Sequence, residues 1–347
     1  MTSIEKLDKN FEVKTLVEGS LVFFNCLEPP FRVHGLMSTP EGFIRLPSDT
    51  ADKVNLKVSI LARSTAGGRV RFRTDSPQIA IRAKMKNVAR MPHFAITGTA
   101  GFDLYEGNTY RGTFVPPYDV QDGYESTQYV YGSAMREYTI HFPLYSEVVS
   151  LEIGLCDGSS LLPARDYRTQ LPVVFYGSSI TQGGCASRPG NSYDNIISRD
   201  LDCDHVNLGF SGGALGEDAM ARYIAGLSMS ALVYDYDHNA SSPEYLADTH
   251  GKMFRTIRAE NPLLPVVMIT RPQPNPSRDD YLRRAVVMST YLDALKAGDE
   301  NVYFVDGTML LHQFGGDSGT VDACHPNDLG FMCMAKGIGA VLARILS

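Results

Sequence analysis

The stretch that decides the fold of this chain is Leu171-Pro-Val-Val-Phe-Tyr-Gly-Ser-Ser-Ile-Thr-Gln-Gly-Gly184. Residues 173–176 form a short apolar run of β-branched and aromatic side chains, with the length of a buried strand. Gly177 ends this run, and Ser178 and Ser179 follow it. A serine placed where a buried strand turns toward a helix lies at the carboxyl edge of a sheet, where open α/β folds bind their ligands. A polar strand-to-helix turn without any function would show the same pattern.

Beyond this stretch, strand and helix patterns alternate as far as the C-terminus. The predicted strands are 173–176, 204–208, 231–235, 265–270 and 302–305, and the predicted helices are 192–201, 216–226, 243–261, 279–296 and 328–346. Such alternation indicates a parallel sheet that is covered by helices on both faces. We therefore expect catalytic residues at the strand ends and in the loops that follow them.

The first half of the chain shows short alternating strands separated by turn residues, and no helix is predicted there. The predicted strands are 20–25, 55–61, 68–73, 79–85, 94–97, 137–142 and 148–154. Close spacing of this kind is typical of an antiparallel sandwich or jelly roll. Residues 157–170 lose the alternation and are predicted to be the linker. The chain should therefore consist of an all-β domain at 1–165 and an α/β domain at 171–347.

Composition excludes several classes of function. The chain has 32 Lys and Arg against 39 Asp and Glu, a net charge of −7, and no basic block, which argues against nucleic-acid or anionic-membrane binding as its main task. It has no apolar run of about 18 residues, and its polar start lacks a signal core. We therefore expect a cytoplasmic protein, with a trimmed secretory signal as the alternative. The six cysteines form no CxxC pair and are expected to be reduced thiols.

One motif of the first half, Gly101-Phe-Asp-Leu-Tyr105, has two interpretations. It could be an exposed turn that offers aromatic rings and a carboxylate to a sugar-like ligand. It could also be a hairpin whose Leu104 and Tyr105 pack into the sandwich while Asp103 caps the turn.

Two further strand ends carry polar or glycine-rich segments. Asn207-Leu-Gly-Phe-Ser-Gly-Gly213 leaves backbone N–H groups free before a helix, as an oxyanion hole requires, although a glycine-rich turn without function is the alternative. Asn239, after the third strand, could direct its amide toward an oxyanion or could be an ordinary loop residue. His238 beside it is a weaker candidate for any role.

The last strand end leads into Val321-Asp-Ala-Cys-His-Pro-Asn-Asp328. Asp322 could bind one imidazole nitrogen of His325 while the other nitrogen faces a nucleophile. A helix-capping turn is the alternative, because Asn327 and Asp328 are good caps. A metal site of Asp322, Cys324 and His325 lacks a second ligand cluster, so no metal is expected.

Together, these four segments resemble the SGNH hydrolase superfamily, also called the GDSL esterases. The blocks stand in the family's order, as Gly177-Ser-Ser-Ile-Thr, Asn207-Leu-Gly-Phe-Ser-Gly212, His238-Asn239 and Asp322-Ala-Cys-His325, within residues 171–347. The resemblance implies a three-layer α/β/α, flavodoxin-like hydrolase domain without a cofactor. The first half resembles the GxDLY-type β-sandwich that precedes this domain in one bacterial branch of these esterases.

The resemblance also implies the roles of individual residues. Ser179 would be the nucleophile and His325 the base, with Asp322 orienting the imidazole. The backbone N–H groups of Ser179 and Gly212 and the side chain of Asn239 would form the oxyanion hole.

This sequence departs from the family pattern at two places. Ser178 stands where the family usually has Asp before the nucleophile. The third block keeps Asn239 but has lost the Gly and the Asp of the usual Gly-x-Asn-Asp. Arg188, in the loop after the nucleophile, is a candidate for substrate binding or for a solvated turn residue.

The function expected from this resemblance is that of a serine esterase acting on small acyl esters, acetyl esters in particular, with a small molecule or a carbohydrate as the alcohol portion. An acyltransferase using the same acyl-enzyme is one alternative. A carbohydrate-binding protein with an inactive hydrolase half is the other.

Overall fold

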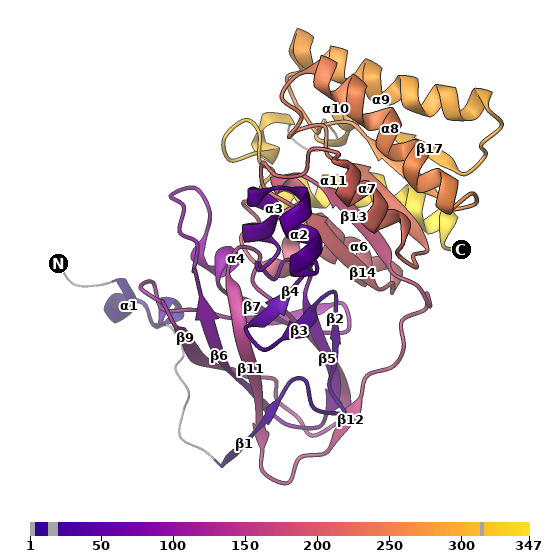
Figure 1. The fold of residues 1–347 in the computed structure, drawn as a ribbon. Coiled ribbons are helices and arrows are strands. Elements are labelled where there is room, and N and C mark those ends of the chain that lie inside the picture. Colours follow the sequence, from indigo (N-terminus) through magenta and orange to yellow (C-terminus); the bar gives the residue numbers. More distant parts are fainter. Residues whose placement is uncertain (1–3, 13–19, 313–315) are drawn as a thin grey trace.

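The computed structural model describes residues 4–12, 20–312 and 316–347 (Figure 1). An N-terminal half made mainly of antiparallel strands lies beside a C-terminal half in which helices cover a parallel sheet. Before the first sheet strand come α1 (Ile4–Leu7) and the 3-10 helix η1 (Lys9–Phe11). Within the described ranges, no helix combines the length and the apolar character needed to cross a membrane.

The N-terminal half is a sandwich of two antiparallel sheets. Its strands are β1 (Leu21–Asn25), β2 (Arg32–His34), β5 (Arg69–Thr74), β6 (Gln78–Lys86), β7 (Phe102–Glu106), β8 (Thr109–Phe114), β9 (Gly123–Tyr129), β10 (Arg136–His141), β11 (Glu147–Cys156) and β12 (Leu161–Pro163). One sheet has the order β1-β11-β6-β9, and the other has β12-β5-β10-β7-β8 with β2 beside β5. Apolar side chains of both sheets form one core, which includes Phe72, Ile81 and Ile153. The predicted sandwich is confirmed.

Several predictions for this half were wrong in detail. Residues 55–61 are not a strand but the helix α3 (Leu56–Leu61), which follows α2 (Ser48–Val54). The apolar alternation at 56, 58 and 60 was misleading, because Val58 is buried whereas Leu56 and Ile60 are exposed. Asn55 starts the helix, since its side chain accepts the Val58 N–H at 2.9 Å.

Two other segments also differ from the prediction. Residues 94–97 do not form a strand; they lead into the one-turn helix α4 (Ile96–Thr99), and Phe94 packs edge-on against Tyr145. Part of the predicted linker is a strand, because β12 pairs with β5. A separate hairpin is formed by β3 (Met37–Thr39) and β4 (Gly42–Ile44).

The C-terminal half is the predicted α/β unit with a five-stranded parallel sheet. Its strands are β13 (Val173–Gly177), β14 (His205–Gly209), β15 (Ala231–Asp235), β16 (Val266–Ile269) and β17 (Val302–Val305), in the order β14-β13-β15-β16-β17. Its helices are α5 (Ser179–Gln182), η2 (Pro189–Asn191), α6 (Tyr193–Leu201), α7 (Asp218–Ala225), α8 (Pro243–Glu260), α9 (Arg278–Lys296), α10 (Gly307–Leu310), η3 (Gly316–Gly319) and α11 (Asp328–Ile345). Each predicted strand and helix of this half is present within one or two residues of its predicted ends.

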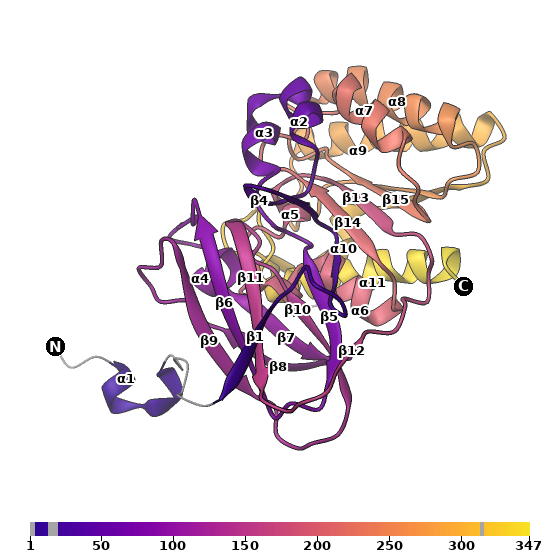
Figure 2. The ribbon, with the colours of Figure 1, turned by 60° about the horizontal axis from the view of Figure 1, so that its bottom comes forward.

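The sheet is covered on both faces, which explains why its strands are continuous apolar runs. Helices α7, α8 and α9 share one core with one face, and α6 and α11 share another core with the opposite face. Figure 2 shows α11 and α6 on the side of the sheet away from α7 and α8.

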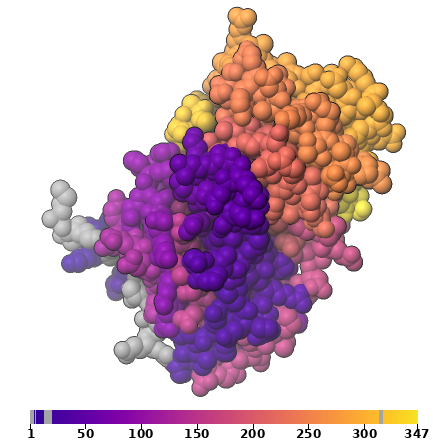
Figure 3. All heavy atoms as spheres, in the orientation of Figure 1, coloured from indigo at the N-terminus to yellow at the C-terminus, as the bar shows by residue number. Residues whose placement is uncertain are grey.

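The two halves are packed into each other. Ala51 of α2 and Val58 of α3 belong to the same buried cluster as Met220 of α7, and both views show α2 beside α7, with α3 next to α2. In the space-filling view, this N-terminal segment lies directly against the C-terminal half (Figure 3).

One buried cation adds to this contact. The Arg45 guanidinium donates to the backbone carbonyls of Asn207 at 3.2 Å and Gly209 at 2.6 Å, at the end of β14. It also donates to the carbonyls of Leu61 and Ser64 in its own half, at 2.7 Å each. Arg45 is only 2% exposed, so these carbonyls replace the water that a guanidinium would otherwise require.

Candidate active site

The predicted nucleophile lies at the turn from β13 into α5. Ser178 is the N-cap residue of this short helix, and its Oγ accepts the Ile180 N–H at 3.2 Å. Ser178 is 1% exposed, so its hydroxyl serves the backbone and does not face solvent. Ser179 is the first helical residue, and its N–H has no acceptor within the helix. The two serines therefore have different places: Ser178 caps the helix, and Ser179 is directed at the edge of the sheet.

Ser179, His325 and Asp322 are connected by hydrogen bonds. Ser179 Oγ lies 2.9 Å from His325 Nε2, and His325 Nδ1 lies 2.7 Å from Asp322 Oδ2. The second oxygen, Asp322 Oδ1, accepts the backbone N–H groups of Cys324 at 3.1 Å and His325 at 2.7 Å. The carboxylate thus fixes both the ring and the backbone of the histidine.

The charge of Asp322 is favoured by these bonds. Burial acts to raise its pKa, but the hydrogen bonds from the side chain and backbone of His325 outweigh burial and leave the pKa below its ordinary value of 3.8. Asp322 is therefore a carboxylate at neutral pH.

The predicted oxyanion residues lie at the neighbouring strand ends. Gly212 has a φ of +62°, a left-handed conformation that glycine adopts without strain, and its N–H finds no acceptor in the described part of the chain. Asn239 Nδ2 donates to the Phe210 carbonyl at 2.9 Å. An amide has two N–H donors, and no described residue accepts the second one. Both groups thus have a donor to offer.

The turn that carries Gly212 is held by two residues that the sequence did not point to. Gln182 Oε1, three residues after Ser179, accepts the Ser211 N–H at 3.0 Å. Lys57, from the N-terminal half, donates to the Gly212 carbonyl at 3.1 Å. Gln182 lies within the motif of the predicted nucleophile, but nothing in that motif indicates a hydrogen bond to Ser211, 29 residues further along the chain.

A buried polar network supports this side of the site. Asn207 Nδ2 donates to the Thr181 carbonyl at 2.6 Å and to Asp194 Oδ2 at 2.7 Å, and its Oδ1 accepts the Gly209 N–H at 2.9 Å. Asp194 and Asn207 are fully buried. Both the turn after β13 and the end of β14 are therefore tied to one side chain.

Two carboxyl groups are buried at and just after the end of β15. Asp235 accepts hydrogen bonds from Tyr193 Oη at 3.1 Å and Thr181 Oγ1 at 3.3 Å. Burial and the neighbouring Asp237 raise the pKa of Asp235 well above its ordinary value. Burial also raises the pKa of Asp237 to about 6, although Arg271 opposes this shift. Neither carboxyl group contacts the Ser179 hydroxyl. Both belong to the buried polar surroundings of the site.

The Gly101–Tyr105 motif lies inside the molecule, so its interpretation as an exposed sugar-binding turn was wrong. The hairpin of β7 and β8 is present, and Asp103 in β7 is fully buried. Asp103 does not cap the hairpin turn. It accepts the Gly190 N–H at 2.8 Å and a bond from Arg188 Nη1 at 3.0 Å, both from the loop after α5.

Close packing accompanies these bonds. A Cβ on Gly190 would lie 2.5 Å from the Tyr105 ring and 2.9 Å from Asp103 Oδ2, so only glycine fits there. Arg188 also lies over the Tyr110 ring, with its guanidinium carbon 3.8 Å from the ring centroid. The structure places Arg188 in the contact between the halves, and a role in substrate binding stays a prediction.

The N-terminal half also reaches the site itself. Tyr145 Oη donates to the backbone carbonyl of Ser179 at 3.3 Å, and the ring of exposed His93 lies 6.3 Å from that of His325, centroid to centroid. Neither residue carried a signal in the sequence, because both come from loops of the sandwich that are far from the four blocks.

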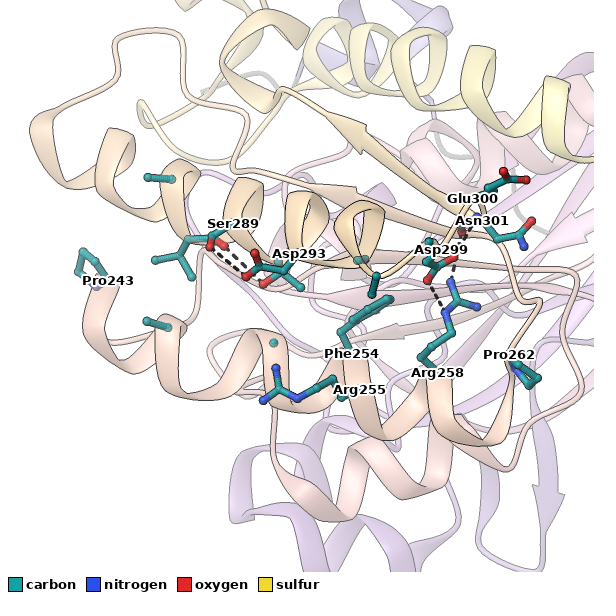
Figure 4. A pocket seen from close by; sticks show the side chains of 18 of the residues that line it. Pro243, Phe254, Arg255, Arg258, Pro262, Ser289, Asp293, Asp299, Glu300 and Asn301 are labelled. Atoms are coloured by element: carbon teal, nitrogen blue, oxygen red, sulfur yellow. Dashed lines mark hydrogen bonds and ion pairs between the residues drawn. The ribbon is translucent and has the colours of Figure 1, made fainter.

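A large cavity lies elsewhere in the molecule. It measures about 1060 Å³ and runs between α8 and α9. Arg258 and Asp299, which line it, form an ion pair at 2.8 Å (Figure 4). None of Ser179, His325 and Asp322 lines this cavity. The chemistry of the sheet edge therefore points to the functional site more directly than cavity size does.

A parallel sheet with a serine, a histidine and a carboxylate gathered at its carboxyl edge is the arrangement of a serine hydrolase. Comparison with known families agrees with this class. Residues 170–343 match the GDSL-like lipase/acylhydrolase family, and residues 21–161 match GxDLY, the N-terminus of Esterase SGNH hydro-type proteins. The chain thus belongs to the GDSL-like (SGNH) family of carboxylic ester hydrolases and carries its GxDLY N-terminal domain.

Solved structures show the same two-part layout. A GDSL-like lipase from Bacteroides ovatus is 27% identical, with a TM-score of 0.83 over 94% of this chain and 98% of that one. The salicylyl-acyltransferase SsfX3 of a tetracycline biosynthetic pathway is 19% identical, with a TM-score of 0.79 over 94% and 99%. A family two carbohydrate esterase from Clostridium thermocellum, solved with cellohexaose, is 17% identical, with a TM-score of 0.60 over 90% and 98%. Among curated proteins, no sequence matches this chain.

Proposed function

We propose that this protein hydrolyses small acyl esters, acetyl esters of carbohydrates in particular, with Ser179 as nucleophile, His325 as general base and Asp322 orienting the imidazole. The observation that carries the proposal is the continuous chain from Ser179 Oγ through both nitrogens of His325 to Asp322, at 2.9 Å and 2.7 Å. Both distances are those of hydrogen bonds ready for proton transfer.

The reaction follows from these contacts. His325 Nε2 takes the proton of Ser179 as Oγ attacks the ester carbonyl, and the carboxylate of Asp322 stabilises the imidazolium that forms. The same proton then passes to the leaving alcohol, which leaves an acyl-enzyme. Water then gives a proton to Nε2 as it attacks the acyl group, and Nε2 passes this proton to Ser179 Oγ as the acid is released.

The negative oxygen of each tetrahedral intermediate needs donors fixed before the reaction. We assign this role to the N–H of Ser179, the N–H of Gly212 and the free amide N–H of Asn239. Support comes from the bonds that hold their turns, namely Asn239 to Phe210 and Gln182 to Ser211.

The proposed substrate class is supported by structural relatives. The Clostridium thermocellum carbohydrate esterase was solved with cellohexaose, and an acetyl xylan esterase from Butyrivibrio proteoclasticus shares the fold at a TM-score of 0.60. In this chain, Gly184 lies so close to the site that an added Cβ would be 3.0 Å from the Ser179 carbonyl oxygen and 3.5 Å from His325 Cδ2. A side chain at position 184 would therefore press on both the proposed nucleophile and the proposed base.

Hydrolysis of p-nitrophenyl acetate by matched serine variants tests the proposal. Ser179→Ala should lower kcat/KM by a factor on the order of 10⁶. Ser178→Ala removes only a helix cap, costs about 1 kcal/mol of stability, and should keep most of the activity. If Ser178→Ala lost the activity and Ser179→Ala kept it, Ser178 and not Ser179 would be the nucleophile, and the proposed assignment would be wrong. A series of acyl lengths, followed by acetylated xylan and cello-oligosaccharides, then defines the substrate.

An acyltransferase is the second candidate, because the fold is shared with a salicylyl-acyltransferase at a TM-score of 0.79. Both activities pass through the same acyl-enzyme and differ only in the acceptor. Product analysis with and without added alcohols distinguishes them, since transfer yields a new ester where hydrolysis yields free acid. Covalent labelling of Ser179 by a fluorophosphonate would rule out a non-catalytic binding protein, because labelling requires a working nucleophile and base.

A further inference from the structure

Three side chains that commonly bind metals meet beside the proposed nucleophile. They are His93 from the sandwich half, Cys185 from the segment after α5, and His325, and their ligand atoms all lie within 4.8 Å of one another. The proposed ester hydrolysis uses only His325. The set differs from the combination of Asp322, Cys324 and His325, which the sequence argues against for lack of a second ligand cluster, because the thiol comes from Cys185 and the third ligand from the other half of the chain.

The existing hydrogen bonds decide which atoms can bind. His325 Nδ1 is occupied by Asp322 at 2.7 Å, so the available nitrogen is Nε2, which now faces Ser179 Oγ at 2.9 Å. A carboxylate on the far nitrogen of a histidine is the usual second partner of a histidine that binds zinc. His93 is exposed, and no described residue forms a hydrogen bond with its ring.

The donor set and its spacing fit one class of metal. Two imidazoles and a thiolate form a tetrahedral zinc site with one open position. In such a site neighbouring donor atoms are about 3.3–3.6 Å apart. The separations here require movements of about 1.5 Å or less, which rotation of the exposed His93 side chain can largely supply.

We propose that His93, Cys185 and His325 bind a zinc ion, and that the bound ion inhibits ester hydrolysis. Zinc takes the lone pair of His325 Nε2, so this nitrogen can no longer accept the proton of Ser179. Cys185 releases its thiol proton to solvent as the Zn–S bond forms, and Ser179 keeps its proton. The inhibition rests on the proposed role of His325 as base, whereas metal binding does not.

Cobalt binding tests the site independently of catalysis. The chelator-treated full chain carrying Ser179→Ala should bind one Co²⁺ and show a thiolate-to-cobalt charge-transfer absorption. This absorption should disappear when Cys185→Ser is added and weaken when His93→Ala is added. His93 is exposed, so its variant decides the question even if Cys185→Ser fails to fold. Cys324→Ser is the matched control, since Cys324 lies next to His325 in sequence, with its thiol 4.0 Å from His238 Nδ1.

Zinc titration of p-nitrophenyl acetate hydrolysis tests the inhibition. The concentration giving half inhibition should rise by about 10-fold or more in His93→Ala and Cys185→Ser, as expected for loss of a ligand, and should not change in Cys324→Ser. A chelator should restore activity. The site is overturned if no cobalt absorption appears or if it persists in Cys185→Ser. The inhibition is overturned if zinc leaves hydrolysis unchanged or raises it. Cobalt binding without any esterase activity would refute the proposed function and leave the metal site standing.

Discussion

The nucleophile turn (residues 177–182) and the base turn (residues 320–327), named after the proposed roles of Ser179 and His325, provide the two sides of the same site, but they are held in place differently. Ser178, Thr181 and Gln182 are buried, and the side chains of Thr181 and Gln182 form hydrogen bonds with Asp235 and Ser211, which are distant in sequence. In the base turn, the side chains of Asp322 and His325 are 34% and 26% exposed. Their bonds are almost all local.

The base turn closes on itself. The Val321 N–H donates to the His325 carbonyl at 3.0 Å, and the Asn327 N–H donates to the Gly319 carbonyl at 2.9 Å. Ser179 is thus positioned by packing of the whole fold, whereas His325 is positioned by the short segment of chain around it. Changes behind the nucleophile should therefore reduce stability, and changes in the base turn should reduce activity alone.

Among the changes that test the contrast between the two turns, Asp322→Asn should give the largest effect and should spare the fold. An amide cannot hold His325 in the required tautomer, so kcat/KM should fall by about 10³–10⁴. The ion pair is partly exposed, so the free energy of unfolding should change by less than about 1 kcal/mol. Steady-state kinetics and urea unfolding measure the two quantities. Asp317→Asn, at an exposed position in η3 just before the base turn, is the control, and a large loss of stability in Asp322→Asn would break the contrast between the two turns.

Asn239→Ala tests the assignment of the oxyanion donor. Loss of one such donor lowers kcat by about 10²–10³, with a smaller effect on KM. Kinetics on p-nitrophenyl acetate measure this, and Asn191→Ala, in the loop after α5, serves as the control. If kcat falls by less than tenfold, Asn239 only holds the Phe210 turn and does not stabilise the oxyanion.

Asn207→Ala should act on stability. The change removes the Asn207 partner of the Thr181 carbonyl and of the Gly209 N–H and leaves buried Asp194 with His205 but without its Asn207 donor, which should cost about 3–4 kcal/mol. Urea unfolding measures the loss. The active-site titre, determined with a fluorophosphonate, should show that the molecules still folded react normally. Equal losses of stability in Asn207→Ala and Asp322→Asn would show that the two turns are held alike.

Asp237→Asn should change how stability depends on pH. Burial raises the pKa of Asp237 from 3.8 to about 6, so the folded state favours the protonated form. The native protein should therefore lose up to about 3 kcal/mol relative to Asp237→Asn as the pH rises from about 4 to about 7. Below pH 4 the difference between the two proteins should be constant. Urea unfolding across this range measures it, and parallel pH profiles would show that Asp237 ionises without cost in the folded state.

The C-terminal half could be predicted well because each of its elements has a strong local signal. Buried parallel strands such as 173–176 and 231–235 are apolar runs with clear ends, and the long helices have capping residues. The four blocks lie at strand ends, so the meeting of Ser179 with His325 follows from the topology.

The remaining features depend on partners that are distant in sequence. The apolar alternation of residues 56–60 fits a strand as well as a helix, and only the burial of Val58 in the cluster that contains Met220 and the Asn55 cap decide for the helix. Asp103 looked like a turn residue because nothing local reveals that Gly190 and Arg188 fill the space above it. The group of His93 and Cys185 beside His325 needs the two halves in place before it exists.

Arg45 has a consequence for how such proteins can change over generations. A side chain of the N-terminal half satisfies carbonyls at the end of β14, the strand that leads into the turn with Gly212. Replacing the sandwich with an unrelated one would leave those carbonyls without a donor and uncover the cluster around Met220. New specificities are therefore expected to arise by point changes in loops such as the one with His93. The two halves should therefore evolve together, and neither should be found combined with an unrelated partner domain.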